Sequence, residues 1–569
     1  MLRLTRGSTL SRAILCLLAG HLVLGLASLL MLPRGRASMR PVTTRTSSSS
    51  PTSGCCRGSS RRGWRLDVEA YARDAPMPYA NVPPYSRNGG LTYQSFYAGP
   101  ADRVARVKAL VHGRPDAPRQ YAAGRDLNGL AMHPPLYYLA LTPVYLATRQ
   151  LGWAAHLLSL RLASYLFAWA ALVVRVYACA TGASPAADGS QEAARWAMLG
   201  IALWPVLVPS WFPEMARLGN DSLSTLVLAG AWLVTVRATA TGPSLGQALG
   251  LGVLLAAGCL TKLYFLPVAV AFVGFGLVRA WSAGGGAALA VAARRLAVVP
   301  LLIAGVAGWW YVANWRDYGV AFAGAEIILQ HRAGGLVGAL GQLSPASAAK
   351  GAAVFVATLA WPGTWSLVRP PSAGIAPVVL GILFGAGAYA AALRRFPPAA
   401  LAWLPAWLAV WVLVGFGYQA LMRAAVTGQA QPGHYLHFLA VAAGVAVGLG
   451  LRTGWRHAGF RGVAAGFAVY AVLFGVAMSW AQVMLFGGWL FKAGATNIYR
   501  LPDGLPPFLG LPDALHRLRT LAYPGAGAIA WVAGAPGPGR PEAGVEEREH
   551  PGAPGSMIRW AHNTGPSRS

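Results

Sequence analysis

The stretch RDLNGLAMHPPLYYLALTPVY, residues 125–145, places a charged and amide-rich run, a histidine and two prolines directly before an aromatic and aliphatic segment. A pore or a plain membrane anchor does not need this arrangement. An active site that faces lipid can use it, because polar groups are then required where a headgroup meets the protein. The rest of the chain decides whether such a site is plausible.

The composition around this stretch is that of a membrane protein. Of the 569 residues, 55% are hydrophobic and only 11% are charged, against about 25% charged residues in a typical soluble protein. Apolar runs of about 20 residues, the length that spans a bilayer, recur along the chain. They cover residues 13–32, 157–180, 196–212, 222–240, 245–260, 263–281, 296–315, 373–393, 399–421, 435–451 and 463–486. These runs predict an all-α polytopic membrane protein with about 11 transmembrane helices (range about 10–13), plus exterior juxtamembrane helices.

The charge and the cysteines exclude several other classes of protein. The net charge of +29 comes from arginines in the connections between apolar runs, without the aromatic and basic stripe of a nucleic-acid module. We therefore predict no nucleic-acid partner and expect membrane lipids and phosphate-bearing substrates instead. The five cysteines have neither metal-ligand spacing nor a disulfide pattern, so no metal site is predicted and any cofactor is unknown.

Arginine-rich short connections predict the cytoplasmic side of the membrane. They include Arg237, Arg279, Arg294, Arg295, Arg452, Arg456 and Arg461. All of these connections share one side if the apolar segments 134–151 and 351–368 enter the membrane and return without crossing it. Both segments are short and contain prolines, which suits interfacial helices. The alternative is two further crossings.

This topology divides the chain into five segments. Residues 1–32 form a cytoplasmic N-terminus and an uncleaved first transmembrane helix. Residues 33–65 are of low complexity and expected to be disordered, and residues 66–156 form an exterior loop with juxtamembrane helices. Residues 157–487 form the transmembrane core, and residues 488–569 form an exterior, largely disordered tail. Most acidic residues before the tail then lie outside, so the chemistry is expected on the exterior face.

Two polar residues at the exterior ends of apolar segments are candidates for that chemistry. His133 precedes the helix of the opening stretch, where it serves a site or caps an interfacial helix. Arg161 lies just inside a span, where an unpaired charge is costly. It extends to the headgroups or pairs with an acid such as Glu214 or Asp221.

Two connections between spans add further candidates. The sequence PEMARLGNDS, residues 213–222, brings Glu214, Arg217 and Asp221 close together. Asp221 also suits the first turn of a helix, where acids are favoured. The sequence GCLTKLY, residues 258–264, contains Lys262, which contacts a phosphate as a point charge or extends to the headgroups.

Taken in order, these motifs resemble the multi-spanning C-type glycosyltransferase superfamily, over residues 95–450. Its members include 4-amino-arabinose lipid A transferases and protein O-mannosyltransferases. The matching pieces are HPPLYYL at 133–139, RLAS at 161–164, Arg217 with Asn220 and Asp221, TK at 261–262 and GHYLH at 433–437. HPPLYY is the most specific of them.

The resemblance implies a membrane enzyme that moves a hexosyl or pentosyl group from a polyprenyl-phosphate donor to a glycan, lipid or protein acceptor. The site would face outward, in the inner membrane of a bacterium. An exterior carboxylate would act as general base, and basic residues would stabilise the departing lipid phosphate. On this basis the catalytic candidates are Asp102, Glu214 and Asp221. The substrate- and phosphate-binding candidates are His133, Arg161, Arg217, Lys262, His434 and Tyr435.

The chain departs from the family in two places. Ahead of an amphipathic helix and the turn Gly113-Arg114-Pro115, the family has a carboxylate pair followed by a histidine. Here Ala98-Gly99 replaces the acids, and Asp102 stands where the histidine falls, so Asp102 is the first candidate for the base. His434 stands where the family has an arginine. Two alternatives are kept: a non-catalytic, glycosyltransferase-like lipid-binding scaffold, which the missing acids favour, and a secondary transporter.

Overall fold

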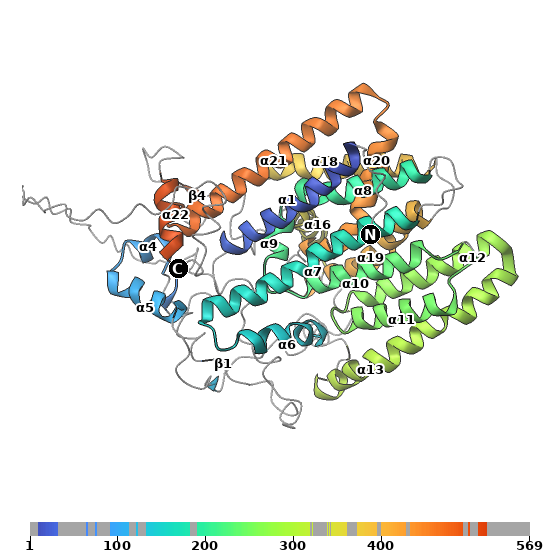
Figure 1. The fold of residues 1–569 in the computed structure, drawn as a ribbon, viewed down its shortest axis with the longest axis horizontal. Helices are drawn as coiled ribbons and strands as arrows, with labels where there is room; N and C mark the ends of the chain where they lie inside the picture. The colour runs from blue at the N-terminus through green and yellow to red at the C-terminus, as the bar shows by residue number, and fades with distance from the viewer. Residues whose placement is uncertain are drawn as a thin grey trace, which may run out of the picture. The chain divides into compact units, whose positions relative to one another are not determined.

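The structure is a computed structural model that is almost entirely helical in the part of the chain it describes (Figure 1). That part comprises residues 9–31, 64–65, 74–76, 91–112, 121–122, 133–182, 190–239, 241–318, 321, 338, 341, 343–360, 372–394, 400–427, 433–492, 499–500 and 510–520. All of these residues belong to one compact unit, Met1–Pro524. Residues 33–63 of the predicted low-complexity segment and most of the predicted tail lie outside the described residues, whereas Trp64 and Arg65 form a strand.

The described helices run from α1 to α22 in chain order. The first half contains α1 (Thr9–Met31), α4 (Tyr93–Tyr97), α5 (Ala101–His112), α6 (Leu136–Thr148), α7 (Trp153–Gly182), α8 (Ser190–Leu207), α9 (Trp211–Met215), α10 (Asp221–Val236) and α11 (Leu245–Cys259). The second half contains α12 (Phe265–Leu296), α13 (Val298–Tyr318), α16 (Pro345–Ala360), α18 (Ser372–Leu393), α19 (Ala400–Thr427), the 3₁₀ turn η2 (Gly433–Leu439), α20 (Ala440–Gly454), α21 (Ala458–Phe486) and α22 (Leu511–Thr520). Four two-residue strands pair as β1 (Trp64–Arg65) with β2 (Tyr121–Ala122), and β3 (Phe491–Lys492) with β4 (Tyr499–Arg500).

The predicted class is confirmed: the chain is an all-α polytopic membrane protein. Each predicted apolar run lies largely on a helix. Among the described residues, 6 helices are long and apolar enough to cross a membrane, and several shorter apolar helices accompany them. The figure of about 11 crossings stays a prediction.

Helix α6 is the segment predicted to enter the membrane and return. It has 13 residues, which corresponds to about 20 Å at about 1.5 Å per residue and is shorter than a bilayer core of about 30 Å. The backbone N–H of Leu136 donates to the carbonyl of Leu260, 2.8 Å away, so α6 begins against the turn between α11 and α12. In the second predicted segment, the described helix is α16, and residues 361–368 lie outside the described part of the chain.

Helix α12 agrees with the predicted run 263–281 and continues beyond it as a second helix. The apolar run was expected to end at residue 281, and α12 consists of two helices that meet at a kink, where Gly284 and Gly285 have non-helical φ and ψ angles. Gly285 has a φ of +60°, which a residue without a Cβ adopts readily. The first helix of α12 therefore ends at the kink, and Leu296 of the second helix lies next to Gly276 of the first.

Helices α8 and α20 make a close contact through glycines. A Cβ on Gly448 would collide with the carbonyl oxygen of Trp196, and a Cβ on Gly200 would collide with the backbone of Gly444 and Gly448. Gly444 and Gly448 are four residues apart on α20, the small-residue spacing that lets membrane helices approach closely. The backbones of the two helices therefore contact each other at this crossing.

We expect Gly448→Ala to destabilise the protein by about 1–3 kcal/mol, because the added methyl must push α20 away from α8. Thermal unfolding in detergent measures the effect. Gly462→Ala in α21 is the matched control, since a Cβ there meets nothing within 4 Å. Equal melting of the two variants would contradict the close crossing.

Candidate functional site

Four ionisable side chains form a buried chain of ion pairs between two inter-helix connections. Glu214 belongs to α9, Arg217 to the connection that follows, Asp221 to the start of α10, and Lys262 to the turn between α11 and α12. The first three are three and four residues apart, so a near-helical backbone points them at one another. Lys262 comes from 41 residues further along the chain. We call this set the charge quartet.

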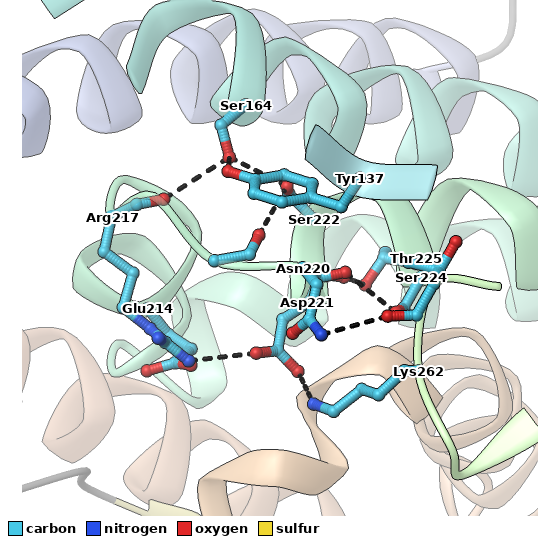
Figure 2. Close-up of polar contacts among 12 residues, drawn as sticks. Tyr137, Ser164, Glu214, Arg217, Asn220, Asp221, Ser222, Ser224, Thr225 and Lys262 are labelled. Atoms are coloured by element: carbon cyan, nitrogen blue, oxygen red, sulfur yellow. Dashed lines mark hydrogen bonds and ion pairs between the residues drawn. The ribbon is translucent and has the colours of Figure 1, made fainter. Parts of the chain in front are cut away.

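The ion pairs link the quartet in the order Glu214, Arg217, Asp221 and Lys262 (Figure 2). The Nε of Arg217 donates to Oε1 of Glu214 at 2.8 Å, and its Nη2 also donates to that oxygen. The same Nη2 donates to Oδ2 of Asp221 at 2.9 Å, and the Nζ of Lys262 donates to Oδ1 of Asp221. The side chains of Glu214 and Asp221 are 0% and 2% exposed, and those of Arg217 and Lys262 are 7% and 10% exposed. Two acids and two bases balance each other, as burial requires.

Hydrogen bonds from α7 hold the Arg217 connection in place. Arg161 donates its Nε–H to the carbonyl of Ala216 at 2.8 Å. Ser164 lies 2.8 Å from the hydroxyl of Ser222 and receives a hydrogen bond from Tyr137 of α6 at 2.9 Å. The sequence motif RLAS therefore supplies two side chains that support the quartet from one helical turn.

A further bond joins the two connections directly. The side-chain amide of Asn220 donates to the carbonyl of Thr261 at 3.0 Å, next to Lys262. Together with the Asp221–Lys262 ion pair, it fixes the start of α10 against the turn between α11 and α12. The Asn-Asp and Thr-Lys pairs of the sequence thus meet in space.

Aromatic rings surround the ammonium group of Lys262. The Nζ lies 5.0 Å from the ring centres of Tyr264 and Tyr435 and 5.9 Å from that of Phe438. Rings at these distances attract a cation through their π faces. Tyr435 was a predicted binding residue, whereas Tyr264 and Phe438 were not singled out, although both lie beside predicted residues.

The quartet has one unused acceptor. The Oε2 atom of Glu214 is buried and has no hydrogen-bond partner among the described residues. Burial, reinforced by the charge of Asp221, raises the pKa of Glu214 to about 7, although Arg217 acts in the opposite sense. Burial also lowers the pKa of Lys262, against the attraction of Asp221. Glu214 is therefore a carboxyl group that can exchange a proton near neutral pH.

His437 is a neighbouring residue that the sequence analysis did not select. It lies on η2, its Nε2 is 3.1 Å from the hydroxyl of Ser210, and its ring packs edge-on against Trp211. Its Nδ1 is buried without a hydrogen-bond partner in the described structure. The available signal was its position in GHYLH, three residues after His434.

The remaining predicted residues lie in other surroundings. His133 is exposed immediately before α6, and the side chain of His434 lies outside the described residues. Asp102 is on α5, with a side chain that is 63% exposed and forms an ion pair with Arg106. The hydrogen bond from Arg106 lowers the pKa of Asp102. No hydrogen bond or ion pair within the described ranges connects Asp102 to the quartet.

No group of three or more His, Cys, Asp or Glu side chains that could hold a metal ion is found among the residues that the structure describes. The quartet offers two carboxylates, but both face cations. The arrangement is suited to proton transfer and to contact with an anion.

Comparison with known proteins does not assign this chain to a family. No family model matches the chain, and no curated protein matches it. Among solved structures, the apo crystal structure of ArnT from Cupriavidus metallidurans is similar to it with a TM-score of 0.40 and 15% sequence identity, over 93% of this chain and 77% of that chain. A TM-score of this size supports no inference about activity, so the functional argument rests on the side chains.

We expect Asp221→Asn to lower the free energy of unfolding by about 3–5 kcal/mol, because it leaves the buried ammonium of Lys262 without a counter-charge. Adding Lys262→Met should restore part of the loss by removing the unpaired cation. Denaturation in detergent measures both variants.

Asp102→Asn is the control, because it also removes a carboxylate from an ion pair but on an exposed helix face. It should leave stability almost unchanged. If Asp221→Asn were as stable as the control, the quartet would not be the buried network described above.

Proposed function

We propose that the protein is a membrane glycosyltransferase that moves a sugar from a polyprenyl-phosphate donor to an acceptor hydroxyl. The observation that carries the proposal is the quartet, which combines a protonatable carboxyl group, Glu214, with two cations in a buried site at helix ends. The order of motifs in the sequence supports the same reaction. We further propose that the site faces the non-cytoplasmic side of a bacterial inner membrane.

The chemistry required matches these groups. The acceptor oxygen attacks the anomeric carbon of the sugar, and the bond from that carbon to the phosphate oxygen breaks. The bonding electrons leave with the lipid phosphate, while the acceptor proton passes to a carboxylate. Lys262 and Arg217 would stabilise the phosphate charge, and in a site of low dielectric such contacts are strong. Arg161 would hold Arg217 in position through the Ala216 carbonyl.

The two candidate bases have different properties. Glu214 has an unused oxygen and a pKa of about 7, close to the operating range in which general bases are effective. Asp102 is exposed, and its pKa is lowered by Arg106, so its carboxylate is a weaker base. We therefore propose Glu214 as the base, with Asp102 as the second candidate and Asp221 as the residue that positions both cations. Tyr435 would shield Lys262, and His133 and His434 would contact the donor or acceptor.

A non-catalytic lipid-binding scaffold is the second candidate function. The charges of the quartet already compensate one another, and Asp221 uses both of its oxygens to bind cations. A site of this kind can stabilise a fold without turning over a substrate. Lipid retention without release of polyprenyl phosphate would favour the scaffold.

The first test uses the purified protein in detergent with a panel of labelled polyprenyl-phosphate sugars and follows release of polyprenyl phosphate. Glu214→Gln should reduce release at least about 100-fold, the usual contribution of a general base. Asp102→Asn should retain most of the activity.

Size-exclusion chromatography must show that each variant is folded. Loss of release in Asp102→Asn with retention in Glu214→Gln would transfer the role of base to Asp102. Release from no donor would contradict the transferase and favour the non-catalytic alternatives, the scaffold first.

The pH dependence of release separates the same two bases in the unmodified enzyme. A base must be deprotonated to accept a proton, so with Glu214 in this role activity should rise as the pH increases through about 7 and then level off. Asp102, with its lowered pKa, would already be ionised across this range and would give a flat profile. Initial rates in overlapping buffers of constant ionic strength distinguish the two results.

A further inference from the structure

Helices α10 and α11 carry a second cluster of charge at the ends opposite the quartet. The turn 237–244 joins these ends, and three arginines gather around it: Arg237 at the end of α10, Arg279 within α12, and Arg295 near the end of α12. The 16 residues of α10 place this turn about 24 Å from Asp221, at about 1.5 Å per residue. The three helices lie side by side (Figure 1).

These arginines bind only neutral groups within the described structure. Arg279 donates Nη1–H to the carbonyl of Ala238 at 3.1 Å, and Arg295 donates Nη1–H to the carbonyl of Pro243 at 3.2 Å. Arg237 donates Nε–H to the hydroxyl of Thr181 at 3.2 Å and stacks over the ring of Tyr177. None of the ion pairs among the described residues involves them, so three positive charges stand together without a described counter-ion.

Arg279 also lines an apolar pocket between α10, α11 and α12. Its neighbours in the lining include Val234, Leu251, Phe272 and Phe275. The Nε–H of Arg279 is buried and has no hydrogen-bond partner among the described residues. The N–H groups of a guanidinium form a planar fork that binds two oxygens of a phosphate, so this unused donor calls for an anionic acceptor.

The side chains beside Arg279 are of the kind that contact membrane lipid. Val278 and Trp281, on either side of Arg279 in the chain, are 48% and 58% exposed. Exposed tryptophans in membrane proteins concentrate at the level of the headgroups. Exposed apolar side chains next to an arginine fit a molecule with a phosphate and an acyl chain better than they fit a water-soluble anion.

We propose that this site binds an anionic membrane lipid, with its phosphate on Arg279 and an acyl chain along the exposed side chains of Val278 and Trp281. The charge of the cluster and the unused Nε–H argue for an anionic headgroup. The sequence predicts this side to be cytoplasmic, where anionic lipids attract clustered arginines. The inference is independent of the reaction proposed for the quartet.

The test measures lipid retention by native mass spectrometry after delipidation and titration with mixed micelles. Phosphatidylglycerol and phosphatidylcholine with the same acyl chains are compared. The unmodified protein should retain phosphatidylglycerol preferentially. Arg279→Met should weaken that retention about tenfold, because a charge-assisted contact is lost, and leave the retention of phosphatidylcholine unchanged. Arg279→Lys, which keeps the charge but not the planar fork, should lie in between.

Arg461→Met is the matched control, since it removes an exposed arginine from α21 on the same predicted face. An equal loss in Arg461→Met would show diffuse attraction and overturn the proposal. Equal retention of the two lipids by the unmodified protein would show that the site does not select an anionic headgroup and would also overturn the proposal. Competition by glycerol 3-phosphate at the same concentration as the lipid would indicate a site for soluble phosphate. Arg295→Met supplies the same test if Arg279→Met does not fold.

Discussion

The arrangement of the site depends on Asp221, whose two oxygens bind two cations from different parts of the chain. One oxygen accepts from Arg217, which precedes α10, and the other accepts from Lys262, which follows α11. Because the site is buried, a cation that left Asp221 would lose a counter-charge without gaining water in its place. Both cations are therefore held at Asp221. The start of α10 and the end of α11 are thereby fixed to each other. Glu214 joins this arrangement through Arg217, which donates a hydrogen bond to its Oε1 atom.

The sequence was sufficient to predict the class of protein and the residues of the quartet. Apolar runs and scarce charges are direct consequences of a lipid environment, so the helices could be predicted from hydropathy alone. The charged residues of the quartet stood out because ionisable groups at the ends of apolar helices are rare and costly. The spacing of Glu214, Arg217 and Asp221 also predicted that they would be neighbours. Long-range contacts could not be predicted in the same way.

Three features depend on tertiary structure and left no local signal. The partner of Lys262 lies 41 residues away, and a single sequence does not show which of several acids it binds. Arg161 was expected to reach lipid headgroups or an acid; its Nε–H binds the carbonyl of Ala216, a contact that was not predicted because a backbone acceptor has no sequence signature. The second helix of α12, beyond the kink at Gly284 and Gly285, was not predicted, because adjacent glycines favour a connection over a helix.

The cations at the two ends of α10 and α11 have different partners. At the quartet, carboxylates compensate both cations, so an anionic substrate must compete with Asp221 or Glu214 for each of them. Around the turn 237–244, arginines meet only carbonyl, hydroxyl and ring groups in the described structure, and an anion can bind without displacing a carboxylate. Tight, lasting occupation is therefore expected at the arginine end. The quartet, where every anion must compete and one carboxyl group titrates near neutral pH, is better suited to a ligand that is bound, converted and released.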